Sequence, residues 1–105
     1  MVFRAATQEI QSIVQQLIER YHPQKIILFG SAARGDPEVR DLDFVIIKRE
    51  TPHYGADRIR EVSRLIDRQC AVDFLVYRPE EWETRHRLGD PFILGILQEG
   101  KILYG

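Results

Sequence analysis

Several features that would place the chain in a specialised class are scarce or missing. Cys70 is the single cysteine, so no intrachain disulfide can form and a disulfide scaffold is excluded. No apolar run approaches the ~20 residues of a membrane-spanning helix, and the N-terminus lacks the hydrophobic stretch of a signal peptide. Acidic and basic residues nearly balance, at 16 and 15, which disfavours a basic nucleic-acid surface. These absences predict a cytoplasmic globular protein.

The composition and the apolar periodicity predict one α+β domain over residues 1–105. Apolar residues make up 44% of the chain and charged residues 30%, which suits a domain with its own core. Apolar spacing predicts a long helix from Thr7, its N-cap, to Tyr21, and a second helix over 56–69. Shorter helices are expected from Pro79 and after Asp90. Apolar runs predict strands over 25–29, 42–47, 71–77 and, at an edge, 102–104. We expect a small mixed sheet packed against helices.

A glycine-rich loop, Gly30-Ser31-Ala32-Ala33-Arg34-Gly35, follows the first predicted strand. Its two glycines have the spacing of a Walker A loop. That motif continues with Lys and Ser or Thr, whereas Asp36 and Pro37 stand here, so the P-loop interpretation is rejected. Two interpretations stay open for the loop alone: a plain turn that uses glycine for positive φ, and a turn that holds phosphate.

Three aspartates stand in or beside predicted strands. Asp41 and Asp43 alternate with Leu42, so both side chains point to the same face of the sheet. Asp73 interrupts the apolar run 71–77, where an unpaired carboxylate would be costly. Each has a plain alternative: a solvated strand start for Asp41 and Asp43, and an edge position or an ion pair with an arginine of the helix 56–69 for Asp73. Together with the loop they predict an oxygen-rich site for Mg²⁺ and a triphosphate.

Taken together, these motifs closely resemble the minimal nucleotidyltransferases of the DNA polymerase β-like superfamily. Members of that family read G-S-x-x-x-G, then S-D-x-D, then a distal Asp. The resemblance implies a polymerase β-like palm fold in which Asp41, Asp43 and Asp73 are catalytic and hold two Mg²⁺ ions. It also implies that Gly30, Ser31 and Arg34 bind the nucleotide. Arg40 stands where relatives carry Ser, and we expect it to add positive charge at the site.

The resemblance also implies a partner. Minimal nucleotidyltransferases are often encoded with a helical HEPN toxin, and some act as its antitoxin by transferring AMP from ATP to a tyrosine of the toxin. A chain of 105 residues has little room for an acceptor domain, so we expect the acceptor on another chain. Two alternatives stay open: a non-catalytic antitoxin that neutralises its partner by contact, and nucleotide addition to an RNA end, which the net charge of −1 disfavours. Homo-oligomerisation also stays open.

Other residues receive plainer interpretations. His22, His53 and His86 lie far apart in the sequence, which disfavours a zinc site. The arginines of the helix 56–69 alternate with acids, which predicts a solvated, ion-paired face. Trp82 is expected to make a core contact with Phe92 and Leu97.

Overall fold

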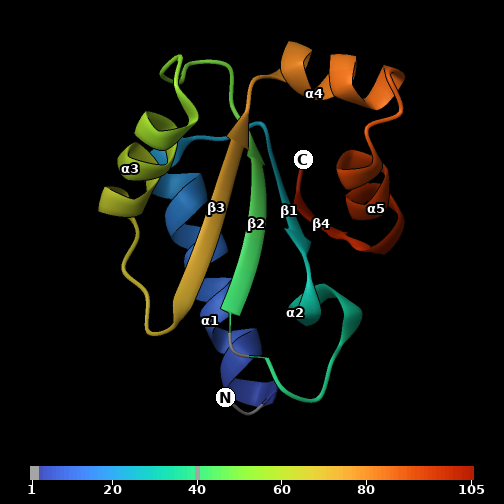
Figure 1. Ribbon diagram of the computed structural model, residues 1–105. Helices are drawn as coiled ribbons and strands as arrows, with labels where there is room; N and C mark the ends of the chain where they lie inside the picture. Colours follow the sequence, from blue (N-terminus) through green and yellow to red (C-terminus); the bar gives the residue numbers. More distant parts are fainter. Residues whose placement is uncertain (1–2, 40) are drawn as a thin grey trace.

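In the computed structural model, which describes residues 3–39 and 41–105, helices pack on both faces of a four-stranded sheet (Figure 1). The elements run in the predicted order along the chain. They are α1 (Phe3–Gln16), the π-type turn η1 (Leu17–Tyr21), β1 (Lys25–Phe29), α2 (Ser31–Arg34), β2 (Asp41–Ile47), α3 (Gly55–Leu65), β3 (Ala71–Tyr77), α4 (Pro79–Arg87), α5 (Pro91–Glu99) and β4 (Lys101–Tyr104). Among the described residues, no helix is both long and apolar enough to cross a membrane.

The sheet is mixed, as the sequence predicts, with the strand order β3-β2-β1-β4. β1 runs antiparallel to both β2 and β4, whereas β2 and β3 are parallel. A parallel pair needs a crossover, and α3 provides it between β2 and β3. The parallel register places Asp43 opposite Asp73 and Phe44 opposite Phe74. This topology leaves β3 at one edge of the sheet and β4 at the other.

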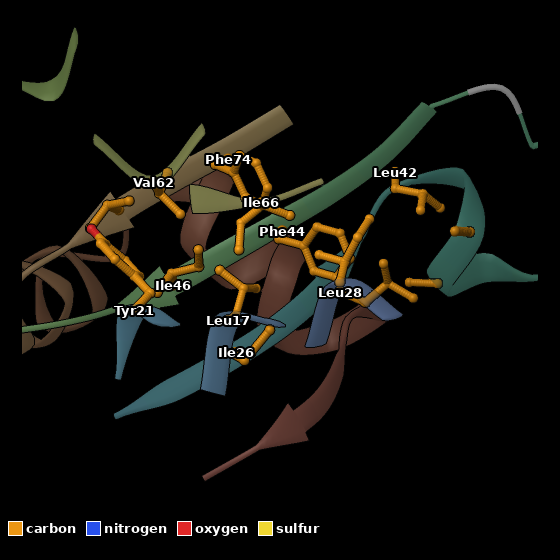
Figure 2. Packing of buried hydrophobic residues seen from close by; sticks show 14 of the residues in the cluster. Leu17, Tyr21, Ile26, Leu28, Leu42, Phe44, Ile46, Val62, Ile66 and Phe74 are labelled. Carbon is orange, nitrogen blue, oxygen red and sulfur yellow. The ribbon is translucent and has the colours of Figure 1, made fainter. Parts of the chain in front are cut away.

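The main core lies between the sheet and the pair α1 and α3. Leu42, Phe44 and Ile46 alternate along β2 and are fully buried on this face. The rings of Phe44 and Phe74 stack with their centroids 6.0 Å apart. Leu17 closes the cluster from the helical side (Figure 2). Because alternate residues face opposite ways, burying these three on one face turns Asp41 and Asp43 to the other.

The opposite face of the sheet carries a smaller core. Ile27, Val45 and Ile47 are buried there beneath Ile96 of α5. The half-buried ring of Trp82 packs against this cluster through Tyr77, with centroids 5.4 Å apart. Phe92 and Leu97, with which Trp82 is predicted to make a core contact, are exposed and do not belong to this cluster.

Two predicted helix boundaries are also wrong, and tertiary contacts explain one of them. α1 begins at Phe3, so Thr7 lies inside the helix and is no N-cap. α3 ends at Leu65 instead of residue 69. The segment after it is held by α1: Gln16 bonds the main chain of Asp67 in both directions, and Glu9 accepts from the Gln69 N–H. These bonds compete with continued helix because they satisfy the same backbone groups.

Candidate active site

A tight turn connects β1 to α2 beside the start of β2 (Figure 1). Gly30 adopts φ 74° and ψ −154°, a region that only glycine enters without strain. A Cβ on Gly30 would collide with the carboxylate of Asp43. Gly30 is therefore required twice over, by its backbone conformation and by the close approach of Asp43.

Asp43 lies at the centre of the site. In the sheet it pairs with Phe29 of β1 on one side and with Asp73 of β3 on the other. Asp73 is exposed, whereas Asp43 is half-buried. Both predicted aspartates thus lie side by side on one face, next to the Gly30 turn. The structure thus brings these two of the predicted site residues together.

The proximity of the two carboxylates has an electrostatic cost. Burial raises the pKa of Asp43 above its usual value, and the neighbouring charges of Asp73 and Asp41 raise it further. The guanidinium of Arg34 opposes this effect and lowers the pKa. Repulsion between adjacent carboxylates is relieved when a cation binds between them. This donor set of carboxylate oxygens fits Mg²⁺ by its chemistry.

Asp41 lies two residues before Asp43, on the same face but exposed to solvent. Within residues 3–39 and 41–105, no three carboxylate, imidazole or thiol groups approach closely enough to form a preformed metal site. Asp41 therefore shares the sheet face of Asp43 and Asp73 but forms no close group of three ligands with them. Arg40, expected to add positive charge, lies outside the described residues.

Arg34 ends the single turn of α2. Its guanidinium contacts Asp36 at 3.1 Å and Glu99 of α5 at 3.7 Å. The side chain is 46% exposed, so neither contact fixes it strongly. Arg34 thus lies beside Gly30, whose carbonyl accepts from the Arg34 main-chain N–H, and its charge acts on Asp43.

Two cavities open over these residues. The first, which we name the glycine cavity, measures about 260 Å³ and is lined by Gly30 and Arg34. The second, the aspartate cavity, measures about 350 Å³ and is lined by Asp43 and Asp73. Phe92 of α5 lines both, so the two cavities adjoin. Its ring packs edge-on against Phe29 at 5.7 Å, which fixes their shared wall.

Arg58 of α3 is the residue that sequence reasoning misread. It is predicted on a solvated face, but only 5% of it is exposed. Its guanidinium pairs with Glu81 of α4 at 2.7 Å. It also donates to main-chain carbonyls of Pro52, His53 and Val76. The spacing of α3 carries no signal for this, because the acceptors come from three other segments.

Comparisons with known proteins agree with this geometry. The model of the nucleotidyltransferase domain family matches residues 9–104. A crystal structure of a Sulfolobus solfataricus protein, provisionally described as a nucleotidyltransferase, superposes with a TM-score of 0.51. The two chains are 24% identical, and the match covers 79% of this chain and 72% of that one. At that identity the likeness establishes the fold. No curated protein sequence matches the chain significantly.

Proposed function

The chain belongs to the nucleotidyltransferase domain family, and we propose that it transfers AMP from ATP to a hydroxyl group of a partner protein. Family membership supports transfer of a nucleoside monophosphate from a nucleoside triphosphate in general. The observation that carries the proposal is the pairing of Asp43 with Asp73 directly beside Gly30. Carboxylates at that position suit a reaction at the α-phosphate of a nucleotide whose outer phosphates lie over the glycine turn.

Each site residue has a role in this proposal. Gly30 and Ser31 would hold the β- and γ-phosphates at the first turn of α2, where main-chain N–H groups lack helical partners. Arg34 would neutralise phosphate charge from its place between Asp36 and Glu99. Asp41, Asp43 and Asp73 would hold two Mg²⁺ ions, which when bound stabilise the charge on the attacking and leaving oxygens. Asp73 would also accept the proton of the acceptor hydroxyl.

The partner that fits the resemblance is a helical HEPN toxin, with a tyrosine as the acceptor. AMP transfer to that tyrosine would make this chain an antitoxin. The predicted reaction forms a bond between the tyrosine oxygen and the α-phosphorus and releases pyrophosphate. Its test is mass spectrometry of a HEPN protein after incubation with this chain and MgATP.

The test needs one variant at the site and one matched control. Asp43→Asn keeps the side-chain shape but removes one charge, so modification should fall by at least ~100-fold. Asp57→Asn makes the same change on an exposed carboxylate of α3 and should modify the partner at the wild-type rate. A pull-down of the partner should be equal for all three proteins, because one carboxylate is a small part of an interface of ~1,600 Å².

Nucleotide binding can be tested without the partner. A ligand that binds only the native state stabilises it by about 2.7 kcal/mol at a hundredfold excess over Kd. We expect MgATP to raise the melting temperature and Mg²⁺ alone to do much less, because Mg²⁺ is held largely through substrate phosphates. An unchanged melt at millimolar MgATP would contradict the proposed enzyme.

A second candidate is a non-catalytic antitoxin that neutralises its partner by contact. One observation favours it: Arg40 stands where members of the resembled family carry Ser before the D-x-D pair. Under this alternative, wild type and Asp43→Asn neutralise the partner equally and neither modifies it. The mass spectrometry above therefore decides between the two candidates.

A further inference from the structure

A third cavity, about 560 Å³ in volume, lies between α3 and α4. We name it the α3–α4 cavity; Arg58, Tyr77, Glu81 and Thr84 are among its lining residues. Ile59 and Leu75 line both this cavity and the aspartate cavity, so the two adjoin. The glycine, aspartate and α3–α4 cavities therefore form a continuous series with the carboxylate pair in the middle. The volume of the α3–α4 cavity is in the range of small-molecule binding sites.

The geometry of phosphoryl transfer assigns the leaving group and the attacking group to opposite ends of this series of cavities. The attacking and leaving oxygens lie roughly in line through the reacting phosphorus. Under the proposed function, pyrophosphate leaves on the side of Gly30 and Arg34. The attacking hydroxyl must then arrive from the opposite side of Asp43 and Asp73. The order of strands β1, β2 and β3 places the open edge of β3 on that side.

We propose that the acceptor of the transferred nucleotide is an extended polypeptide segment that docks along the free edge of β3 and fills the α3–α4 cavity. This inference rests on the proposed function and adds to it the extended conformation of the acceptor segment and its route to the site. The hydroxyl oxygen of the segment bonds to the α-phosphorus as the bond to the bridging oxygen of pyrophosphate breaks. Its proton passes to the carboxylate of Asp73, and pyrophosphate leaves with the electron pair.

The edge of β3 is shaped to pair with a main chain. Four consecutive residues, 72–75, line the aspartate cavity although they alternate between the two faces of the sheet, so this cavity wraps around the strand edge. The carbonyl of Tyr77 turns inward and accepts from the Lys48 N–H, whereas that of Val76 turns outward and accepts from Arg58. By alternation, the main chain of Phe74 also turns outward. Because Arg58 already occupies the Val76 carbonyl, the part of the edge that can pair with a peptide lies at residues 72–74. An open strand edge of this kind binds extended peptides.

The charges along the route disfavour a nucleic acid. Four carboxylates, those of Asp43, Asp73, Glu80 and Glu81, line the aspartate and α3–α4 cavities. The guanidinium groups that line them belong to Arg58 and Arg85, and both are already paired, with Glu81 and Asp90. Glu80 is paired in turn with Arg49, so the repulsion of a phosphate comes mainly from Asp43 and Asp73. An RNA strand needs basic side chains that are available to its phosphates. A neutral or basic peptide meets no such repulsion.

The proposal is tested by amide chemical-shift mapping on the whole 105-residue chain. The probes are an ATP analogue with a non-hydrolysable α–β bridge, with Mg²⁺, then the capped tripeptide Lys-Tyr-Lys, then a short RNA with a free 3′ hydroxyl. We expect the analogue to shift Gly30 and Arg34, and the tripeptide to shift Phe74, Leu75 and Thr84. If the tripeptide shifts none of these at millimolar concentration, or if the RNA shifts them instead, the acceptor inference is wrong. If the analogue fails to shift Gly30 and Arg34, the proposed function itself fails.

Variants test whether the route is used. Ile59→Trp fills the junction of the two cavities, and Thr84→Trp fills the far wall, both at exposed helix positions. Each should raise the tripeptide Kd by at least ~10-fold and leave the Kd of the ATP analogue within ~2-fold. Leu88→Trp adds the same ring at an exposed position outside these cavities and should behave as wild type. A parallel loss of analogue binding in both cavity variants would show that the α3–α4 cavity holds the nucleotide, which would overturn the inference.

Discussion

The close contact between Gly30 and Asp43 predicts an unequal response to the same substitution at the two ends of the glycine loop. Gly30 and Gly35 both have positive φ, at 74° and 73°. An alanine Cβ at Gly35 would meet nothing within 4 Å. At Gly30 it would lie 3.3 Å from the Cγ of Asp43 and collide with the Oδ2. Gly35→Ala therefore measures the backbone cost alone, and Gly30→Ala adds the collision.

The magnitudes follow from these two terms. Gly35 (φ 73°, ψ 30°) is left-handed, where alanine costs about 1–2 kcal/mol. Gly30 (φ 74°, ψ −154°) is in a region that costs a non-glycine residue about 1–3 kcal/mol. Overpacking against Asp43 adds about 1–3 kcal/mol. We expect Gly30→Ala to lower the free energy of unfolding by about 2–6 kcal/mol and Gly35→Ala by about 1–2 kcal/mol.

Urea denaturation at constant m-value measures both changes. The collision itself is isolated by a double-mutant cycle with Asp43→Ala. This substitution removes the clashing atoms and leaves the Asp43 Cβ at an ordinary 3.6 Å. We expect the Gly30→Ala cost to shrink by about 1–3 kcal/mol in the Asp43→Ala background. Equal costs for Gly30→Ala and Gly35→Ala, or a cycle without coupling, would refute the role assigned to Gly30.

Three further predictions concern stability. Burial and Asp73 raise the pKa of Asp43, so its ionised form destabilises the fold at neutral pH. Asp43→Asn should therefore raise the melting temperature, and a lower melting temperature would contradict the electrostatic account. The ion pair with Arg58 lowers the pKa of Glu81, so the stabilisation from this pair is present above the unfolded-state pKa and is lost as the pH falls through the folded-state pKa. Melting temperatures measured down an acid titration should show this loss in the wild type. An equal loss in Glu81→Gln would exclude the ion pair as its source. Asp90→Ala removes the N-cap of α5, whose carboxylate accepts from the Phe92 N–H. It should lower the free energy of unfolding by about 0.5–2 kcal/mol in urea denaturation. No change would mean that α5 is held by packing alone.

Replacing Arg58 should cost more stability than replacing Glu81, its partner in the ion pair. Arg58→Met deprives three main-chain carbonyls and Glu81 of their donor, at a cost of about 2–3 kcal/mol, because hydrogen bonds to charged groups are the stronger ones. Glu81→Gln leaves the carbonyl bonds in place and should cost about 1 kcal/mol. Urea denaturation of the two variants gives both values. A larger cost for Glu81→Gln would show that the ion pair, and not the carbonyl bonds, anchors Arg58.

The sequence by itself determined the elements and the faces of their side chains. The apolar runs predicted β1 and β3 with the bounds that the structure has, at 25–29 and 71–77. The alternation of Asp41, Leu42 and Asp43 placed both carboxylates on the face opposite the core, because a strand has a period of two wherever it is placed. The turn at the glycine loop was likewise predicted by the local residue types.

Only the tertiary structure decided which of these residues meet. The parallel pairing of β2 with β3 brings Asp43 opposite Asp73, and no local pattern encodes that register, because a shift by two residues would leave every side chain on the same face. The burial of Arg58 depends on carbonyls from Pro52 and Val76 and on Glu81, which approach α3 only after the chain has folded. The α3–α4 cavity arises in the same way, from distant segments. Periodicity fixes the direction of a side chain, whereas its neighbours are fixed by packing between segments remote in the sequence.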